Sequence, residues 1–145
     1  MSSQVQSLEV SYFLQMTEDE EKVLKAVAVL VGDVPPERQE AEGHFGNAII
    51  WVRHHLTGGD AESAFKKIVS RMDGDERRVV LGELPSLLDE HNALYIRLSK
   101  QVLVMNGNAV LASSDPIRVK VKPRSFMIKG DPVAFYTRLF EDASH

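Results

Sequence analysis

The sequence contains no cysteine among its 145 residues. This absence excludes disulfides, thiolate zinc sites, iron–sulfur ligation and a cysteine nucleophile, and it fits a reducing compartment. Long apolar runs are also missing, because no stretch approaches the roughly 18 to 20 residues that a membrane span needs. The first residues, Met1-Ser2-Ser3-Gln4, lack the basic and apolar segments of a signal peptide. We therefore expect a cytoplasmic protein that does not contact a membrane.

Signatures of the common enzyme classes are absent as well. The sequence has no phosphate loop with Gly-Lys-Ser/Thr, no Gly-x-Ser-x-Gly elbow and no His-Glu-x-x-His motif. Asp60 follows the pair Gly58-Gly59, and its carboxylate at the start of a helix would repel a phosphate. His54 and His55 are adjacent on an expected strand and point to opposite faces, so they cannot chelate one metal ion together. We expect no catalytic residues, no metal site and no cofactor.

The net charge of −4 is unevenly distributed along the chain. Residues 1–92 hold 9 Lys or Arg and 17 Asp or Glu. Residues 97–129 hold 7 Lys or Arg and 1 Asp or Glu. A polyanion responds to the local field rather than to the total charge. The apolar share of 43% and the charged share of 26% are typical of a globular protein, and at this length we expect residues 1–145 to form a single domain.

Alternating apolar and polar residues predict a series of short strands. The expected strands cover residues 5–14, 38–42, 48–56, 94–104, 109–112 and 117–122. Asn106-Gly107-Asn108 is a strong signal for a hairpin turn, because Asn and Gly tolerate positive φ.

Helical spacing and capping residues predict helices between these strands. Thr17 to Glu20 is typical of a capping box, and the helix that it begins ends at Gly32. Further helices are expected after Gly58-Gly59-Asp60, after Gly74-Asp75 with a break or kink at Gly82 and Pro85, and after Gly130-Asp131-Pro132. The order β-α-β-β-α-α-β-β-β-α predicts an α+β fold with a largely antiparallel sheet and helices packed on one face.

The strongest candidate site is the segment Ile117 to Arg124. Alternation places Arg118, Lys120, Lys122 and Arg124 on one face, with the valines and Ile117 toward the core. Like charges stacked over about 20 Å repel one another unless an anion offsets them, and a phosphate backbone is a natural counter-ion. An alternative interpretation is a solvated strand face, or an edge strand that lysine protects from aggregation.

Neighbouring residues extend this candidate. Arg97 and Lys100 on the preceding expected strand would widen the basic patch, and Tyr95 could stack on an unpaired base. In the segment Gly43 to Asn47 the glycines allow backbone amides to face an anion, while His44 and Phe45 could contact a base. A simple hairpin turn with Phe45 over the core explains that segment equally well.

Four segments resemble, in the same order, an archaeal family of predicted RNA-binding proteins or predicted exosome subunits. They are Thr17 to Val23, Gly43 to Asn47, Leu94 to Gln101 and Asp115 to Lys122, and the resemblance runs over about residues 8–122. It implies a fold similar to that of the ribosomal protein that holds 5S ribosomal RNA, and it suggests a homodimer and a role in RNA processing or translation. The sequence departs from the family at Ala48, where many members have Pro, and at Val102-Leu103, where they have small residues.

The sequence therefore predicts a non-catalytic RNA-binding protein, with a structured RNA as the expected partner. It would serve as an accessory factor in RNA processing by an exosome or in translation. One alternative is a scaffold subunit whose basic strand docks an acidic partner or pairs edge to edge with a second copy. Another is an enzyme acting on a nucleotide or on RNA, which would need a clustered acid–base pair such as His44 together with His54 or Glu42 in one pocket.

Overall fold

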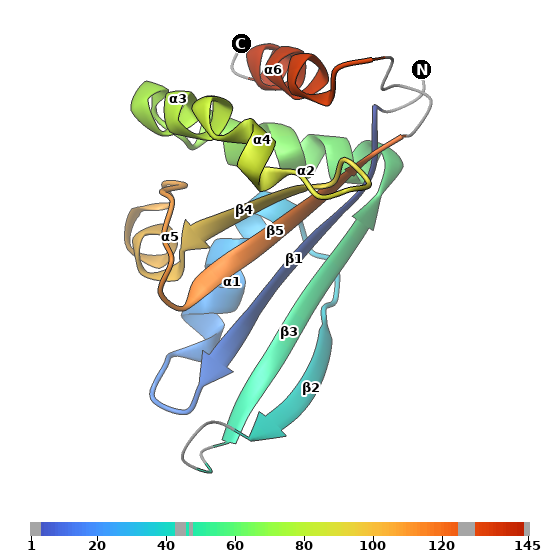
Figure 1. Cartoon of the computed structure of the whole chain (residues 1–145). Coiled ribbons are helices and arrows are strands. Elements are labelled where there is room, and N and C mark those ends of the chain that lie inside the picture. The colour runs from blue at the N-terminus through green and yellow to red at the C-terminus, as the bar shows by residue number, and fades with distance from the viewer. Residues whose placement is uncertain (1–3, 43–45, 47, 125–129, 144–145) are drawn as a thin grey trace.

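A computed structural model describes residues 4–42, 46, 48–124 and 130–143 of the chain. Its strands and helices follow in the order β1-α1-β2-β3-α2-α3-α4-β4-α5-β5-α6 (Figure 1). The strands are β1 (Val5–Gln15), β2 (Glu37–Glu42), β3 (Ala48–Thr57), β4 (Leu94–Ser99) and β5 (Pro116–Pro123). The helices are α1 (Glu20–Val31), α2 (Gly58–Ser70), α3 (Gly74–Gly82), α4 (Leu84–Leu87), α5 (Lys100–Asn106) and α6 (Pro132–Ala143).

The strands form one sheet in the order β2-β3-β1-β5-β4, and every neighbouring pair is antiparallel. The expected α+β fold with an antiparallel sheet is confirmed. β5 lies between β1 and β4, so the interpretation of the basic segment as a protected edge strand is wrong. Edge-to-edge pairing of this strand with a second copy is excluded for the same reason, since both of its sides already carry ladder hydrogen bonds.

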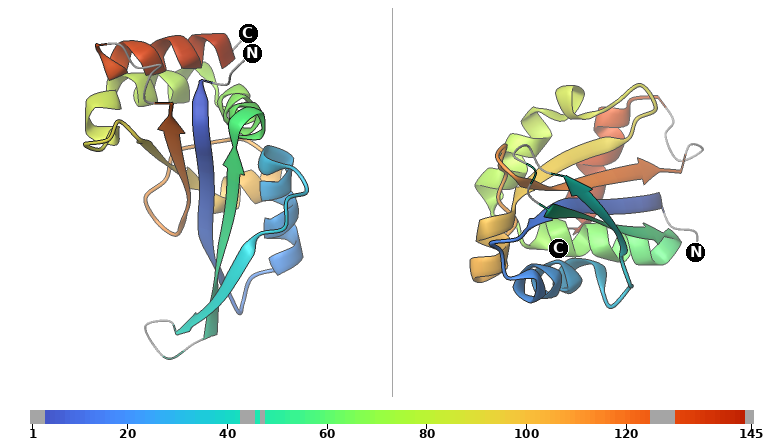
Figure 2. Two further views of the ribbon diagram at one scale, coloured as in Figure 1. Left: turned by 90° about the vertical axis from the view of Figure 1, so that its right-hand side faces the viewer. Right: turned by 90° about the horizontal axis from the view of Figure 1, so that it is seen from below.

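The sheet has one covered face and one open face. Amphipathic helices α1 and α2 pack on the covered face, and in Figure 1 they lie behind the strands; the view turned by 90° in Figure 2 shows them on one side of the sheet. The alternation predicted for β1 holds, because Leu8, Val10, Tyr12 and Leu14 are buried in the core. The other side chains of the strand then face outward.

α6 lies across one end of the sheet and packs on α2 and α3 (Figure 2). Phe65 of α2 and Phe140 of α6 meet edge to face, with ring centroids 5.3 Å apart. Tyr136 donates a hydrogen bond of 2.6 Å to the carbonyl of Asn92, which ties α6 to the turn before β4. None of the described helices is long and apolar enough to cross a membrane.

Two predictions of helix boundaries met different outcomes. The break between α3 and α4 is confirmed, because α3 ends at Gly82 and Pro85 lies in the first turn of α4. The capping box from Thr17 is wrong: α1 begins two residues later than expected, and the side chain of Asp19 accepts from the Lys22 amide as the N-cap.

Of the long strand expected at 94–104, only the first half is confirmed. Its first part is β4, but the chain turns into helix α5 at Lys100, and the side chain of Ser99 caps that helix by accepting from the Val102 amide at 3.1 Å. Gly107 has φ of +78° and ends the helix, so Asn106-Gly107-Asn108 is a helix C-terminus rather than a hairpin turn. The short strand expected at 109–112 is reduced to one bridge, between Leu111 and Leu98.

Candidate nucleic-acid interface

The cations of β5 lie on the open face of the sheet. Arg118 and Lys122 are exposed and Lys120 is half-buried, while the intervening Val119 and Val121 are buried in the core. Alternation therefore separates charge from core along this strand, as the sequence predicted. Because β5 is hydrogen-bonded on both sides, the row of cations is held on a fixed backbone.

The register of the sheet adds cations from neighbouring strands. Arg118 pairs with Arg97 of β4 on one side and with Ser11 of β1 on the other. Ser11 in turn pairs with Arg53 of β3, so one transverse row carries three guanidinium groups. Like charges that face each other across strands destabilise a sheet unless an anion offsets them.

Arg53 is already neutralised within the molecule. Its guanidinium donates to Glu9 at 3.0 Å and to Glu37 at 2.7 Å, and the hydrogen bond to Glu37 is the main cause that raises the pKa of Arg53. His55 lies 4.0 Å from the same Glu9 carboxylate. This side of the open face therefore balances its own charge.

The β4–β5 side is not balanced in this way. Across the described residues, no carboxylate lies within salt-bridge distance of Arg97, Arg118, Lys120 or Lys122. The hydroxyl of Tyr95 as a hydrogen-bond partner raises the pKa of Lys120 above its ordinary value, so the ammonium stays charged. The region carries a net positive charge that is open to solvent.

Aromatic rings lie among these cations. The Lys120 ammonium is 5.4 Å from the ring centroid of Tyr95, and the Arg118 guanidinium is 6.0 Å from that of Phe13. Arg53 lies 5.7 Å from the ring centroid of Trp51. The open face thus carries three pairs of an aromatic ring and a cation.

A small hollow of about 310 Å³ lies between β3, β1 and β5 on this face. Its walls are polar side chains and the stems of two lysines. They come from Gln6, Ser7, Glu9, His55, Thr57, Lys120 and Lys122. The hollow offers hydrogen-bond donors beside the cationic row.

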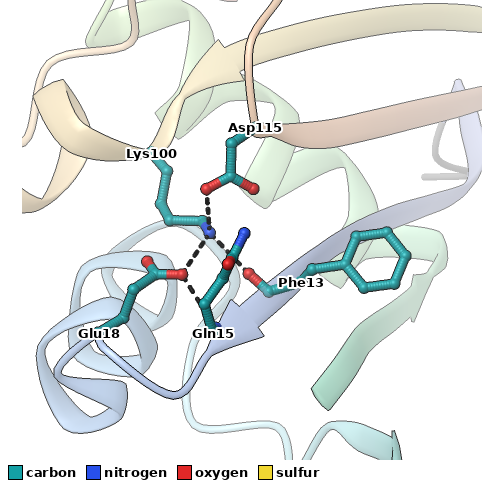
Figure 3. A network of polar contacts seen from close by, with 5 residues as sticks. All are labelled: Phe13, Gln15, Glu18, Lys100 and Asp115. Atoms are coloured by element: carbon teal, nitrogen blue, oxygen red, sulfur yellow. Dashed lines mark hydrogen bonds and ion pairs between the residues drawn. The ribbon is translucent and has the colours of Figure 1, made fainter. Parts of the chain in front are cut away.

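Lys100 does not join this surface, and its expected contribution to the patch is wrong. It begins α5 rather than continuing β4, and it is only 5% exposed. Its ammonium donates to the Phe13 carbonyl at 2.6 Å, to Glu18 at 3.0 Å and to Asp115 at 2.9 Å (Figure 3). All three donors are used, so this lysine at the start of α5 joins β1, the turn before α1 and the residue that precedes β5, and it has no hydrogen left for a phosphate.

The remaining predicted site residues fall into two groups. Arg124 follows the end of β5, is half-buried and has its guanidinium 4.0 Å from the position that a Cβ on Gly58 would take, so it lies near the start of α2. His44 and Phe45 lie outside the described residues. The turn 43–47 therefore stays a prediction.

The histidines do not form a site. His54 faces the core and is 3% exposed, whereas His55 is exposed on the open face, as the alternation predicted. The imidazole Nε2 of His54 lies 2.8 Å from the hydroxyl of Tyr12, and burial lowers the pKa of His54. Within the part of the chain that the structure describes, no three His, Asp or Glu residues could hold a metal ion.

Two residues of the open face, Phe13 and Trp51, were not predicted from the sequence. Phe13 received no role, although the inward placement of Tyr12 and Leu14 already implies that it points outward. Trp51 could not be assigned to a face, because both faces of β3 carry large apolar side chains. The register with β1 decides it: Trp51 pairs with Phe13.

Comparison with known proteins gives a consistent result. Residues 7–123 match the model of a protein family described as RNA binding. RNA-binding protein PAB1135 of Pyrococcus abyssi is 28% identical over 137 residues, which cover 90% of this chain and 89% of that protein. The uncharacterised protein MJ0213 of Methanocaldococcus jannaschii is 29% identical over 119 residues, 77% of this chain and 80% of that protein. The crystal structure of AF2318 from Archaeoglobus fulgidus, of the family DUF54, has a TM-score of 0.77 at 29% identity and covers 93% of this chain and 99% of that one.

Proposed function

The chain belongs to this RNA-binding family, and on that premise we propose that it binds RNA through the open face of its sheet, without catalysing a reaction on it. Arg118, Lys120 and Lys122 of β5, with Arg97 of β4, would contact the phosphates. Arg124, His44 and Phe45 are proposed as further contributors. Lys100 is left out because its ammonium is buried.

One observation carries the proposal. Four cations share one face of two neighbouring strands, and no carboxylate of the described residues lies within salt-bridge distance of them. A row of like charges costs stability. A polyanion that binds there removes the repulsion and releases its own condensed counterions, which gives affinity that falls with salt.

The test is the affinity for RNA of the double variant Lys120→Gln, Lys122→Gln. Neutralising two phosphate contacts is expected to weaken binding at low salt and to flatten the slope of log K against log salt concentration by about 0.7 to 0.9 for each cation. Fluorescence anisotropy with a labelled RNA at several salt concentrations measures both quantities. Glutamine removes the charge but keeps a polar, unbranched side chain, and it avoids placing an acid opposite Glu9.

The matched control is Lys66→Gln, Lys67→Gln, which removes the same charge from exposed positions of α2 on the other side of the molecule. It is expected to leave the salt slope unchanged. Equal effects of the two double variants, or a wild-type affinity that does not respond to salt, would contradict the proposed interface.

The finer biological role is a proposal that rests on the family resemblance. The protein would be an accessory factor in RNA processing by an exosome or in translation. Its fold would be related to that of the 5S-ribosomal-RNA-binding protein, and a second copy of the chain would be a partner. Capture of partners from a lysate with and without nuclease separates this role from a protein scaffold. Partners that survive digestion of the RNA would favour a scaffold that docks acidic proteins on the same cations.

A further inference from the structure

We infer that the open face selects unpaired RNA, by stacking bases on Tyr95, Phe13 and Trp51. The inference rests on the proposed function and adds the class of RNA that this face would bind. It modifies the expectation of a structured RNA, because the contacts would be to the single-stranded loops or ends of such a molecule.

The first support is the placement of the rings. Phe13, Tyr95 and Trp51 all point to the face that α1 and α2 leave open, and Tyr95 is 42% exposed. These rings therefore do not pack between the sheet and the helices α1 and α2. Base stacking on aromatic rings of an exposed sheet is how single-stranded RNA is bound by several unrelated folds.

The second support is that two of the rings are paired with a cation that forms no salt bridge among the described residues. Lys120 lies over Tyr95 at 5.4 Å from the ring centroid, and Arg118 lies over Phe13 at 6.0 Å. Every nucleotide has a flat base and a charged phosphate. A ring with a cation beside it complements both parts, whereas a duplex offers only the phosphates because its bases are stacked on one another.

The third support is the path between the rings. Tyr95 lies in the transverse row of Lys120 and Glu9, and Phe13 lies four residues further along β1. The two positions are therefore about 13 Å apart along the strands and about 10 Å apart across them. Arg118 and Arg97 lie between these rows, so an RNA strand that crosses β5 diagonally would meet the Tyr95 ring, then the two arginines, and then the rings of Phe13 and Trp51.

Tyr95 is also held in place before any ligand arrives. Its hydroxyl donates to the Asp89 carboxylate at 3.0 Å. That carboxylate in turn accepts from the amides of His91 and Ala93, both at 2.9 Å. A ring fixed in this way loses little side-chain entropy when a base stacks on it.

The test compares one labelled RNA of about 12 nucleotides, within the usual site size of such surfaces, with the same strand annealed to its complement. Tyr95→Leu is expected to weaken binding of the single strand by about 5- to 150-fold, the range for one lost stacked base, and to change binding of the duplex by less than about twofold. Tyr95→Phe keeps the ring and is the matched control, with an expected change of less than about threefold. Phe13→Leu, which preserves apolar packing, is expected to behave like Tyr95→Leu.

Trp51 supplies a readout that needs no substitution. It is the single tryptophan of the chain, so its fluorescence reports on this face alone. The single strand is expected to quench it on binding, and the duplex at equal saturation is expected to leave it nearly unchanged.

The outcomes separate the two proposals. If both RNA forms bind equally well, lose affinity with the lysine double variant and leave Trp51 fluorescence unchanged, the inference fails and the proposed function stands. If neither form binds in a salt-dependent way, the proposed function fails and the stacking inference fails with it. Tighter binding of the duplex by the wild type would also overturn the inference.

Discussion

The ammonium of Lys100 shows how much the surroundings of one residue decide its role. A lysine in a basic third of the sequence looks like a phosphate contact, but here three oxygen acceptors surround it. Glu18 and Asp115 come from segments nearly a hundred residues apart, and Asp115 adopts φ of +45°. This side chain therefore joins distant parts of the fold.

We predict that Lys100→Met lowers the free energy of unfolding by about 2 to 4 kcal/mol, because it leaves a buried carbonyl and two carboxylates without their partner. The estimate is below the full range for buried pairs, since Glu18 and Asp115 remain partly hydrated. Urea denaturation measures the change. Lys66→Met on the exposed side of α2 is the control, with an expected change within about 0.5 kcal/mol. If Lys100→Met lowered the affinity for RNA without changing the stability, Lys100 would be a residue of the RNA interface and this prediction would be wrong.

At the scale of elements, the sharpest boundary is the end of α5. Gly107 lies in the left-handed region, where a side chain is disfavoured, and a Cβ there would come within 2.8 Å of the Arg71 guanidinium. That guanidinium donates to the Gly107 carbonyl at 3.1 Å, so the helix end and α2 are joined at this point.

Gly107→Ala is predicted to lower the free energy of unfolding by about 1 to 2 kcal/mol, the cost of a non-glycine residue in this conformation. Gly59→Ala in the first turn of α2 is the control, because its added methyl meets open space and its φ is not positive. It is expected to be neutral or to stabilise by up to about 1 kcal/mol. Thermal unfolding of the two variants shows the difference, and equal melting temperatures would count against the helix cap.

Periodicity predicts most elements of this fold but not where α5 begins. The alternation through Leu98 is a strand signal, and it continues in the sequence beyond Ser99 because Val102 and Val104 also suit a strand. What ends the strand is the cap by the Ser99 hydroxyl and the ion pairs of Lys100, which depend on segments distant in the sequence. The inward and outward sides of β5, by contrast, depend only on neighbours and were predicted.

At the scale of the whole molecule, positive charge is concentrated in two neighbouring strands. β4 and β5 carry four cations and no Asp or Glu, whereas each of the helices α1, α2 and α3 carries as many acids as cations. A polyanion responds to the local field of these strands, so the overall acidity of the chain does not prevent the encounter.

Stability of the whole fold is predicted to depend on pH through His54. Burial lowers the pKa of His54 from its ordinary value of 6.5, while the Val34 backbone partly opposes this shift. As the pH falls below about 6.5, His54 therefore takes up a proton in the unfolded chain but not yet in the folded chain. The free energy of unfolding decreases as the pH falls. The loss ends once the pH is below the lowered pKa of the folded state.

Denaturation of the wild type and of His54→Gln across this pH range measures the effect as the difference between the two slopes. The slope of the variant is expected to be smaller. His91→Gln, at an exposed turn, is the control and is expected to keep the wild-type slope. Parallel curves for wild type and His54→Gln would show that another group titrates instead.

The central position of β5 has a consequence for adaptability. A strand bonded to neighbours on both flanks cannot shift its register or bend toward a ligand without breaking two ladders at once. On the proposed interface the protein therefore acts as a rigid template, and the RNA must supply nearly all the conformational adjustment. Flexible segments of RNA would fit such a template readily, while stiff ones would touch only part of it.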